Sequence, residues 1–313
     1  MNTILVTGGS GFIGSHVIQR LLSNYDIVNF DLKKSQNNQI KQIIGDITDY
    51  SLVEKAVEKC DAIIHLAAQI SVPQSYDDPS ENDRINVHGT QNIIEAAQKY
   101  GIKRLIMASS AAVYGRCNNL PLNEQSAGEC LSPYAKSKWQ NESQILLARE
   151  SGLQAVALRF FNVYGPGQRT DGAYAAVIPK FIQMMSKNEQ PIVNGDGMQS
   201  RDFIHVSDVA NAIEMLLKTD WQMIEQHAYN IASQSQSTLM DLIEVINKEF
   251  RAQKPSFEEI LPLYQSERQG DIRHSHADIS LIKKALGWTP KTIFSQGIKE
   301  LVDLELNNKG GLE

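Results

Sequence analysis

Short apolar runs of strand length alternate with segments of helical spacing through the first half of the chain. Ile4-Leu5-Val6 is followed by a segment, 12–22, in which apolar residues recur three and four positions apart. The same alternation predicts strands at 26–31, 43–44, 62–66, 104–109 and 155–160, and helices at 52–60, 81–100 and 134–150. Strands separated by helices predict right-handed crossovers, and therefore an α/β fold with a doubly wound parallel sheet.

The pattern changes after about residue 165. Pro and Gly become denser, and helical spacing returns only at 173–187, 207–217, 238–250 and 295–306. We therefore predict a larger domain over residues 1–165 and a smaller C-terminal α/β region over 166–313, with a boundary crossed by discontinuous segments.

Composition excludes several classes of function. The chain has 313 residues and a net charge of −6, which makes a nucleic-acid partner unexpected because nonspecific binding relies on basic residues. None of the three cysteines forms a Cys-x-x-Cys pair and the histidines show no ligand spacing, so we expect no metal and a reduced, cytoplasmic protein. We see no export signal and no apolar run of about 20 residues, and so expect no membrane association.

A glycine-rich turn follows the first predicted strand. Gly8, Gly11 and Gly14 would let the backbone approach a pyrophosphate at the start of the next helix. Asp31 ends the second strand, about 20 residues further on, where a carboxylate can accept both hydroxyls of an adenosine ribose. The spacing predicts a dinucleotide site on a Rossmann fold.

The charge of Asp31 also selects the cofactor. A ribose 2′-phosphate would be repelled by this carboxylate, so we expect NAD rather than NADP. Lys33 and Lys34 are close enough to favour a phosphate instead, but we interpret them as solvated loop lysines.

A tyrosine and a lysine lie four residues apart at the start of a predicted helix. Tyr134 and Lys138 therefore share one helix face, and the ammonium, together with a positive nicotinamide ring, would favour the phenolate form of the tyrosine. Such a tyrosine can take a proton from a sugar hydroxyl. The pair follows a strand that ends at Ser109 and Ser110, where α/β sheets place their sites.

Seven motifs, in order along nearly the whole chain, carry a resemblance to a known family. They are Thr7–Gly14, His65–Ala68, Ser109–Gly115, Tyr134–Lys138, Arg159–Pro166, Gly195–Phe203 and Arg268–Asp271. Together they resemble the extended short-chain dehydrogenases/reductases, and within them the nucleotide-sugar epimerase branch, which includes UDP-glucose and UDP-N-acetylglucosamine 4-epimerases.

The resemblance implies roles for individual residues. Tyr134 would be the catalytic base, Lys138 its partner, and Ser110 a hydrogen-bond partner of the reacting sugar oxygen. The implied cofactor-binding residues are Gly8, Gly11, Phe12, Ile13, Gly14, Asp31, Asp46, Ile47, Leu66, Ala67, Ala68, Asn86, Ser109, Tyr134, Lys138 and Phe161. The implied substrate-binding residues are Ser71, Ser110, Asn162, Val177, Ile178, Asn194, Arg201, Arg268, Asp271 and Ser275. Residues 1–165 would then be the NAD-binding domain and 166–313 mainly the nucleotide-sugar region.

Two alanines distinguish between reactions within the family. By resemblance, dehydratases carry an Asp-Glu pair directly after the catalytic serine, and decarboxylases a Glu, for proton transfer during elimination. Ala111 and Ala112 stand at these positions and transfer no proton. We therefore predict 4-epimerisation of a UDP-hexose by transient oxidation at C4, rotation of the 4-keto sugar and return of the hydride, with NAD tightly bound throughout.

The sugar preference follows from one small residue. By resemblance, Ser275 flanks the C2 substituent, where epimerases restricted to glucose and galactose are bulky, and Ser71 would help to bind an N-acetyl group. We predict UDP-GlcNAc/UDP-GalNAc as substrates, and UDP-Glc/UDP-Gal as further ones. A uronic acid sugar with Arg273 as its carboxylate partner is an alternative. Asn194 replaces the aromatic residue that the family often has, so base stacking there is not expected.

Other readings of the chain stay open at this stage. They are a 4-keto reductase that releases its product and a noncatalytic NAD-sensing regulator on the same fold. By resemblance, the helices at 81–100 and 134–150 would pair with those of a second copy in a four-helix bundle, which predicts a homodimer.

Overall fold

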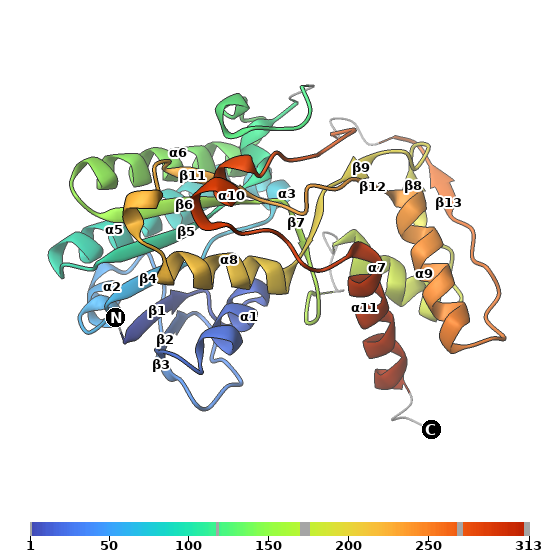
Figure 1. The fold of residues 1–313 in the computed structure, drawn as a ribbon, viewed down its shortest axis with the longest axis horizontal. Coiled ribbons are helices and arrows are strands. Elements are labelled where there is room, and N and C mark those ends of the chain that lie inside the picture. Colours follow the sequence, from blue (N-terminus) through green and yellow to red (C-terminus); the bar gives the residue numbers. More distant parts are fainter. Residues whose placement is uncertain (1, 117–118, 170–175, 268–271, 310–313) are drawn as a thin grey trace.

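The computed structural model describes residues 2–116, 119–169, 176–267 and 272–309. Within them, the main sheet has seven parallel strands in the order β11-β6-β5-β4-β1-β2-β3 (Figure 1). Their bounds are β1 Thr3–Thr7, β2 Asp26–Asp31, β3 Lys41–Ile44, β4 Ala62–His65, β5 Arg104–Ser110, β6 Gln154–Phe160 and β11 Ala228–Ile231. The strand order reverses between β1 and β4, and this is where α/β sheets bind their ligands. The predicted Rossmann fold is confirmed.

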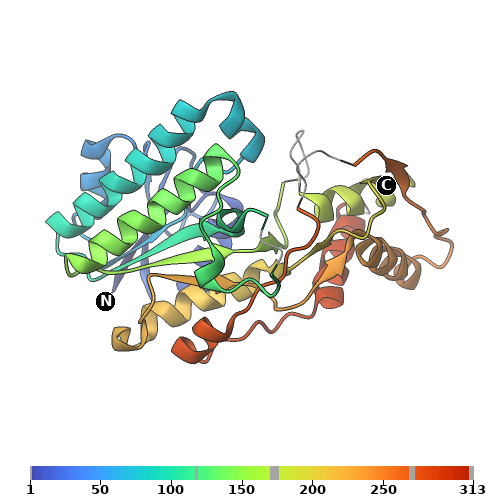
Figure 2. The same ribbon diagram turned by 90° about the horizontal axis from the view of Figure 1, so that it is seen from above.

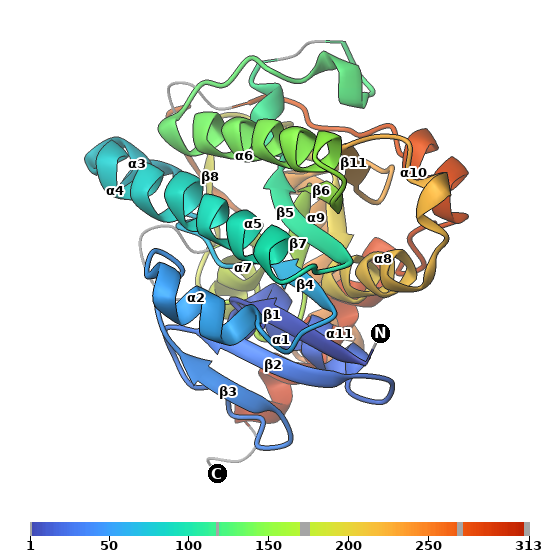
Figure 3. The same ribbon diagram turned by 90° about the vertical axis from the view of Figure 1, so that its left-hand side faces the viewer.

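Helices cover both faces of the sheet (Figure 3). On one face, α2 (Tyr50–Val57), α5 (Gly89–Lys99) and α6 (Pro133–Glu150) enclose an apolar core with strand residues such as Leu5, Ile63 and Leu105. On the other, α1 (Phe12–Leu21), α8 (Val206–Lys218) and α10 (Ser280–Leu286) enclose a second core. The strands other than the edge strand β3 therefore bury residues on both of their faces, which explains the near-continuous apolar runs in the sequence.

The segment predicted as one helix over 81–100 is helical to Lys99 with a wider turn inside it. After α3 (Val72–Asp77), α4 (Pro79–Asp83) leads into a π-helical segment, Arg84–His88, before α5 begins. Asn86 lies in this wider turn, and its side chain is buried. Its Oδ1 accepts a hydrogen bond from the Gln69 N–H, and its amide donates one to the Gln69 carbonyl. Wider turns of this kind often occur at functional sites.

A smaller lobe lies beside the main sheet (Figure 2). Its helices, α7 (Val177–Ser186), α9 (Leu239–Gln253) and α11 (Phe294–Lys309), enclose a third core that includes Phe181, Ile246 and Ile298. Three two-stranded sheets accompany these helices: β10–β7, β12–β9 and, at the outer edge of the lobe, β13–β8 (Figure 1). Their strands are β7 Asn162–Tyr164, β8 Ile192–Asn194, β9 Ser200–Arg201, β10 Phe203–His205, β12 Ser237–Thr238 and β13 Leu263–Gln265.

The later half of the chain also contributes to the main sheet. Strand β11 adds to its edge beside β6, and α8 packs against α1. The helix at 207–217 was predicted and is α8, but the strand β11 was not predicted, because a four-residue strand flanked by turns gives almost no periodicity. None of the described helices has the length and apolar character needed to cross a bilayer.

Candidate active site

The turn after β1 is built so that only glycine fits. Gly8 has φ +69°, and a Cβ there would lie 2.7 Å from the Ala67 backbone nitrogen. A Cβ on Gly14 would lie 2.2 Å from the Gly8 carbonyl oxygen. Helix α1 begins directly after Gly11 with no side-chain cap, so the N–H groups of its first turn face outward for an anion. This cradle fits the pyrophosphate of a dinucleotide.

Asp31 ends β2 beside this turn. Its Oδ2 accepts a hydrogen bond from the Ser10 N–H at 2.9 Å and its Oδ1 one from the Lys33 N–H at 3.0 Å. The two backbone donors fix the carboxylate next to the glycine turn, as the ribose-binding role requires. Further along, Asp46 accepts from the Thr48 N–H at 2.9 Å, and Ile47 is buried against Gly89.

The loop after β4 is held against β1 by Thr7. Its hydroxyl oxygen accepts hydrogen bonds from the Leu66 and Ala67 N–H groups at 3.2 Å each. The His65 ring connects this hydroxyl at 2.7 Å to that of Thr90 at 3.0 Å. Burial, with a smaller effect of the Lys138 charge, lowers the pKa of His65 to about 3, so the ring is neutral near pH 7. The loop 66–68 thus forms a fixed wall beside the glycine turn.

Tyr134 and Ser110 meet at the carboxyl end of β5. Helix α6 starts at Pro133, and the Ser132 side chain caps it by accepting from the Ala135 N–H. Tyr134 is buried in the first turn. Burial raises the pKa of its phenol, whereas the side-chain hydrogen bond with Ser110 lowers it. The expected net lowering is therefore not produced by the protein's own groups, and the positive charge of an oxidised nicotinamide would have to complete it.

Lys138 lies one helical turn after Tyr134 and is also buried. Its ammonium donates to the Ala108 carbonyl oxygen on β5 at 3.0 Å. Burial lowers the pKa of Lys138 to about 8, and the charge of Glu142 opposes this effect. The pKa of Lys138 is thus close to physiological pH, and the side chain still carries a positive charge at pH 7.

Three of the predicted cofactor residues have structural contacts of their own. The Asn86 amide reaches Ser137, next to Lys138, at 3.0 Å in addition to Gln69. Phe161 is buried with its ring centroid 6.0 Å from that of Tyr114. The Ser109 hydroxyl donates to Glu142 at 2.5 Å, so its side chain faces the protein interior and only its backbone is left for a cofactor.

A buried ion pair, which the sequence did not reveal, lies behind the catalytic helix. Arg159 of β6 forms a fork on Glu142 of α6, with Nε–Oε1 at 2.9 Å and Nη2–Oε2 at 2.7 Å. Both side chains are at most 2% exposed. Arg159 also donates to the Tyr114 hydroxyl at 2.9 Å, and that hydroxyl donates to Asn230 of β11 at 2.6 Å. The pair connects α6, β5, β6 and β11.

Several predicted substrate residues converge at the junction with the smaller lobe. Asn162 in β7 bonds to the Asp202 carbonyl through both its N–H, at 3.1 Å, and its amide, at 3.2 Å. Arg201 follows Ser200, whose carbonyl accepts from the Ser275 N–H at 3.1 Å. The structure therefore brings Asn162, Arg201 and Ser275 together from distant segments. Arg268 and Asp271 lie outside the described residues.

The remaining predicted substrate residues are more dispersed. Ile178 is 1% exposed and packs in the core of the smaller lobe, so its side chain is committed there, while Val177 is only partly buried beside it. Asn194 ends β8, and its carbonyl accepts from the Gln199 amide at 2.9 Å. Ser71 caps α3 by accepting from the Gln74 N–H at 3.3 Å.

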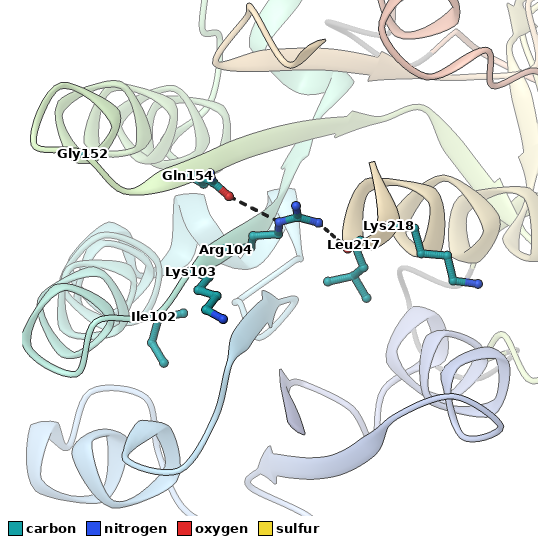
Figure 4. Close-up of a pocket in the computed structure, with 7 residues that line it drawn as sticks. All are labelled: Ile102, Lys103, Arg104, Gly152, Gln154, Leu217 and Lys218. Carbon is teal, nitrogen blue, oxygen red and sulfur yellow. Dashed lines mark hydrogen bonds between the residues drawn. The ribbon is translucent and has the colours of Figure 1, made fainter. Parts of the chain in front are cut away.

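A surface pocket of about 640 Å³ lies elsewhere (Figure 4). It is lined by residues at the amino ends of β5 and β6 and the end of α8: Ile102, Lys103, Arg104, Gly152, Gln154, Leu217 and Lys218. In parallel strands this is the end opposite Ser110, so the pocket is separate from the candidate active site. Among the described residues, no cluster of His, Cys, Asp and Glu could hold a metal ion.

Comparison with known proteins identifies the family. The model of the NAD dependent epimerase/dehydratase family matches residues 4–232, well over half of the chain. The chain belongs to this family. The predicted family resemblance, NAD as cofactor and an enzyme of the epimerase class are thereby confirmed.

Individual relatives match nearly the whole chain. A protein of Methanocaldococcus jannaschii named "Putative UDP-glucose 4-epimerase" is 40% identical over 97% of this chain and 99% of its own length. The UDP-N-acetylglucosamine 4-epimerase of Methanobrevibacter ruminantium, solved with UDP-N-acetylmuramic acid, is 35% identical with a TM-score of 0.90, covering 98% of this chain and 99% of that one. A dTDP-D-glucose 4,6-dehydratase of Mus musculus is 34% identical over 96% of this chain and 87% of its own. The family thus includes both epimerases and dehydratases at similar identity.

Proposed function

We propose that the chain interconverts UDP-GlcNAc and UDP-GalNAc by 4-epimerisation, with UDP-glucose and UDP-galactose as further substrates. The observation that carries the proposal is the turn after Ser110. Ala111–Tyr114 form a single 3₁₀ turn beside the catalytic pair, and its first two residues are alanines. By the family resemblance, a dehydratase or decarboxylase carries an acid or base at this place, and alanine supplies none.

Tyr134, Lys138 and Ser110 would each have a separate role in the reaction at C4. The glycine turn and Asp31 would hold NAD, which would supply the acceptor for the C4 hydride and its later return. Tyr134 takes the proton of the C4 hydroxyl, and the Lys138 ammonium one turn away, together with the positive charge of an oxidised nicotinamide, would stabilise the resulting phenolate. Ser110 holds the sugar oxygen beside the Tyr134 hydroxyl. Proton transfer of this kind contributes about 10²- to 10⁴-fold to a rate.

The smaller lobe would hold the part of the substrate that does not react. Arg201 suits a diphosphate because its guanidinium donates several hydrogen bonds in one plane. An anchored diphosphate leaves the 4-keto sugar free to turn and present its other face. We propose Arg268, Asp271, Asn162, Val177 and Asn194 as further contacts of the nucleotide, as the family motifs imply.

The junction favours an N-acetyl sugar over a uronic acid. Ser275 is small and lies beside Arg201 through Ser200. Arg273, the alternative partner for a uronic carboxylate, already pairs with Asp196 at 2.6 Å and Glu267 at 3.5 Å. Its charge is balanced without a substrate. The M. ruminantium relative, whose name gives an N-acetylated substrate, supports the same choice.

The assembly and location are also proposals. Leu146 and Leu147 on α6 are 41% and 62% exposed, on the side of the sheet where α5 also lies, and would be covered in a homodimer built on a four-helix bundle. A monomeric mass by light scattering would contradict this. The free thiols Cys60 and Cys130 suit the reducing cytoplasm.

A product assay tests the proposed reaction. The purified protein is incubated with UDP-GlcNAc, UDP-glucose, UDP-glucuronic acid and dTDP-glucose, each without added cofactor, and products are separated by chromatography. We expect the C4 epimer of UDP-GlcNAc and no loss of water or carbon dioxide. Turnover only with added NADPH would indicate a reductase, and NAD binding without any turnover would indicate a regulator.

A further inference from the structure

Three buried polar residues follow one stripe of α6 at intervals of one turn. Tyr134 and Lys138 form the proposed catalytic pair, and Glu142 comes four residues later. All three are buried although charged residues are rarely buried without a partner. The structure therefore places the Glu142 carboxylate one helical turn after Lys138, and Tyr134 one turn before it.

Two side-chain contacts join this stripe to the strand that carries the catalytic serine. Lys138 donates to the carbonyl of Ala108 at 3.0 Å, and Ser109 donates to Glu142 at 2.5 Å. Ala108 and Ser109 are the two residues before Ser110 on β5. Glu142 is therefore bonded to the neighbour of one catalytic residue and lies one turn from another.

Arg159 fixes Glu142 from a third element. The guanidinium of β6 takes both carboxylate oxygens, and it stacks between the rings of Tyr114 and Trp139 at 5.1 and 5.8 Å from their centroids. A forked pair of this kind restricts both rotation and translation of the carboxylate. Helix α6 is thus locked to β5 and β6 at one point behind the site.

We propose that Glu142 is a positioning residue of the reaction: it fixes α6 against β5 so that Tyr134 faces Ser110, and it supplies a negative charge behind the Lys138 ammonium. The proposal rests on the proposed roles of Tyr134 and Lys138. It goes beyond them because Glu142 touches none of the reacting atoms.

The charges around the lysine favour this role. The titratable groups near Lys138 are Tyr134 and Glu142 on its own helix and His65 on β4, which is neutral near pH 7. Glu142 in turn faces Arg159, Cys130 and His227. Among these groups, Glu142 is the one whose charge raises the pKa of Lys138 against the effect of burial. Loss of that charge should cause Lys138 to lose its proton at lower pH.

The direct test follows the ionisation of Lys138 and needs no turnover. Lysine labelled at Cε gives an NMR signal for each side chain, and the signal absent from Lys138→Met belongs to Lys138. We expect a titration midpoint near pH 8 in the unchanged protein and a midpoint lower by at least about half a unit in Glu142→Gln. An unchanged midpoint in Glu142→Gln would overturn the proposal.

Matched variants separate charge from structure. Arg159→Lys breaks the fork but keeps the Glu142 carboxyl group and a positive side chain opposite it, so the midpoint should stay within about a quarter of a unit of its original value. The double variant E142Q/R159M removes both charges. If the midpoint returned to its original value there, the unpaired arginine, not the missing carboxylate, would have caused the shift, and the proposal would be wrong. If Glu142→Gln does not fold, the Lys138 midpoint is compared between Glu142→Asp, which keeps the carboxylate, and the double variant, which removes it. The midpoint should then be lower in the double variant.

The pH profile of turnover gives the second readout. Activity should fall on the alkaline side as Lys138 loses its proton, and Glu142→Gln should move this fall to lower pH, with kcat at pH 8 lower by at least about twofold for a midpoint shift of about half a unit. Arg159→Lys should lower the melting temperature without moving the alkaline fall. If the unchanged protein turns over no UDP-sugar, the proposed function fails, while the NMR titration still decides the role of Glu142.

Discussion

The two parts of the molecule hold their candidate site residues in different ways. Around the glycine turn and α6, the glycines, Asp31, Ser110, Tyr134 and Lys138 lie at the ends of buried parallel strands or on helices packed against them. On the substrate side, Asn162, Asn194 and Arg201 lie on two-stranded sheets whose strands are two or three residues long, whereas Ser71 caps α3 and Ser275 lies outside the strands. The reacting groups are thus fixed by the packing of the main sheet, whereas the groups that would choose the sugar are held by a few hydrogen bonds outside it. In a site of this kind, substitutions among the sugar-selecting groups can change the substrate while the reacting groups stay in place.

The largest effect is expected from the group that does the chemistry. Tyr134→Phe removes the proton acceptor but keeps the buried ring, so we expect kcat to fall about 10³-fold. NAD affinity, measured by calorimetry, and the melting temperature should stay close to their original values. The Tyr134 hydroxyl has one side-chain hydrogen bond that affects its pKa, to Ser110, so its removal disturbs little else. Turnover within about tenfold of the original would show that another base acts.

The next largest effect is expected on NAD affinity, when a Cβ is added to the glycine turn. Gly8→Ala and Gly101→Ala both place alanine at positive φ, +69° and +63°, which costs about 1–2 kcal/mol of unfolding free energy in each case. Only Gly8 has backbone within 3 Å of the new Cβ, whereas nothing lies within 4 Å at Gly101. We expect Gly8→Ala alone to weaken NAD binding, by at least about tenfold, or 1.4 kcal/mol. Equal NAD affinity in the two variants would contradict the cradle.

A smaller effect should follow from a change on the substrate side. Arg201→Gln removes a charged donor, and a charge-assisted hydrogen bond contributes about 1.5–3 kcal/mol. We expect KM for the UDP-sugar to rise about tenfold with little change in kcat, because the diphosphate is bound equally before and during the reaction. Steady-state kinetics measures both. A fall in kcat alone would place Arg201 with the reacting groups and weaken the contrast between the two parts.

The smallest effect concerns selectivity. Ser275→Tyr should fill the space proposed for the N-acetyl group and lower kcat/KM for UDP-GlcNAc relative to UDP-glucose by about tenfold, within the range that one pocket contact supplies. Ser275→Ala, which keeps the space, is the matched control and should leave the ratio nearly unchanged. A ratio unaltered by tyrosine would remove Ser275 from the sugar pocket.

Periodicity was sufficient to predict most of the larger part. The strand predicted at 26–31 is β2 with the same bounds, and the helix predicted at 134–150 begins one residue earlier because Ser132 caps it and Pro133 starts it. The helix predicted over 81–100 is present as an unbroken helical run to Lys99, but its π-helical segment at Arg84–His88 was not predicted, because a single wider turn leaves little trace in the apolar pattern. The helix predicted at 173–187 begins at Val177 in the structure, and 173–175 lie outside the described residues.

The buried polar cluster was not predictable for a different reason. Glu142, Asn141 and Lys138 are polar residues on a helix, and such residues normally indicate a solvated face. Their burial depends on partners from other strands, above all Arg159, and a single sequence gives no sign of that pairing. The roles assigned to individual site residues stay predictions until the variants above are measured.

The edge position of β11 has a consequence for how the chain is made. Strand β6, whose residues Ala155–Phe160 are all buried in the finished sheet, gains its outer neighbour only when Ala228–Ile231 has been synthesised. Until then a nascent chain carries an apolar strand with one unpaired edge, which is a template for pairing with other chains. Messages truncated between the codons for residues 160 and 228 would therefore yield products that aggregate or depend on chaperones, rather than a small folded dinucleotide-binding protein.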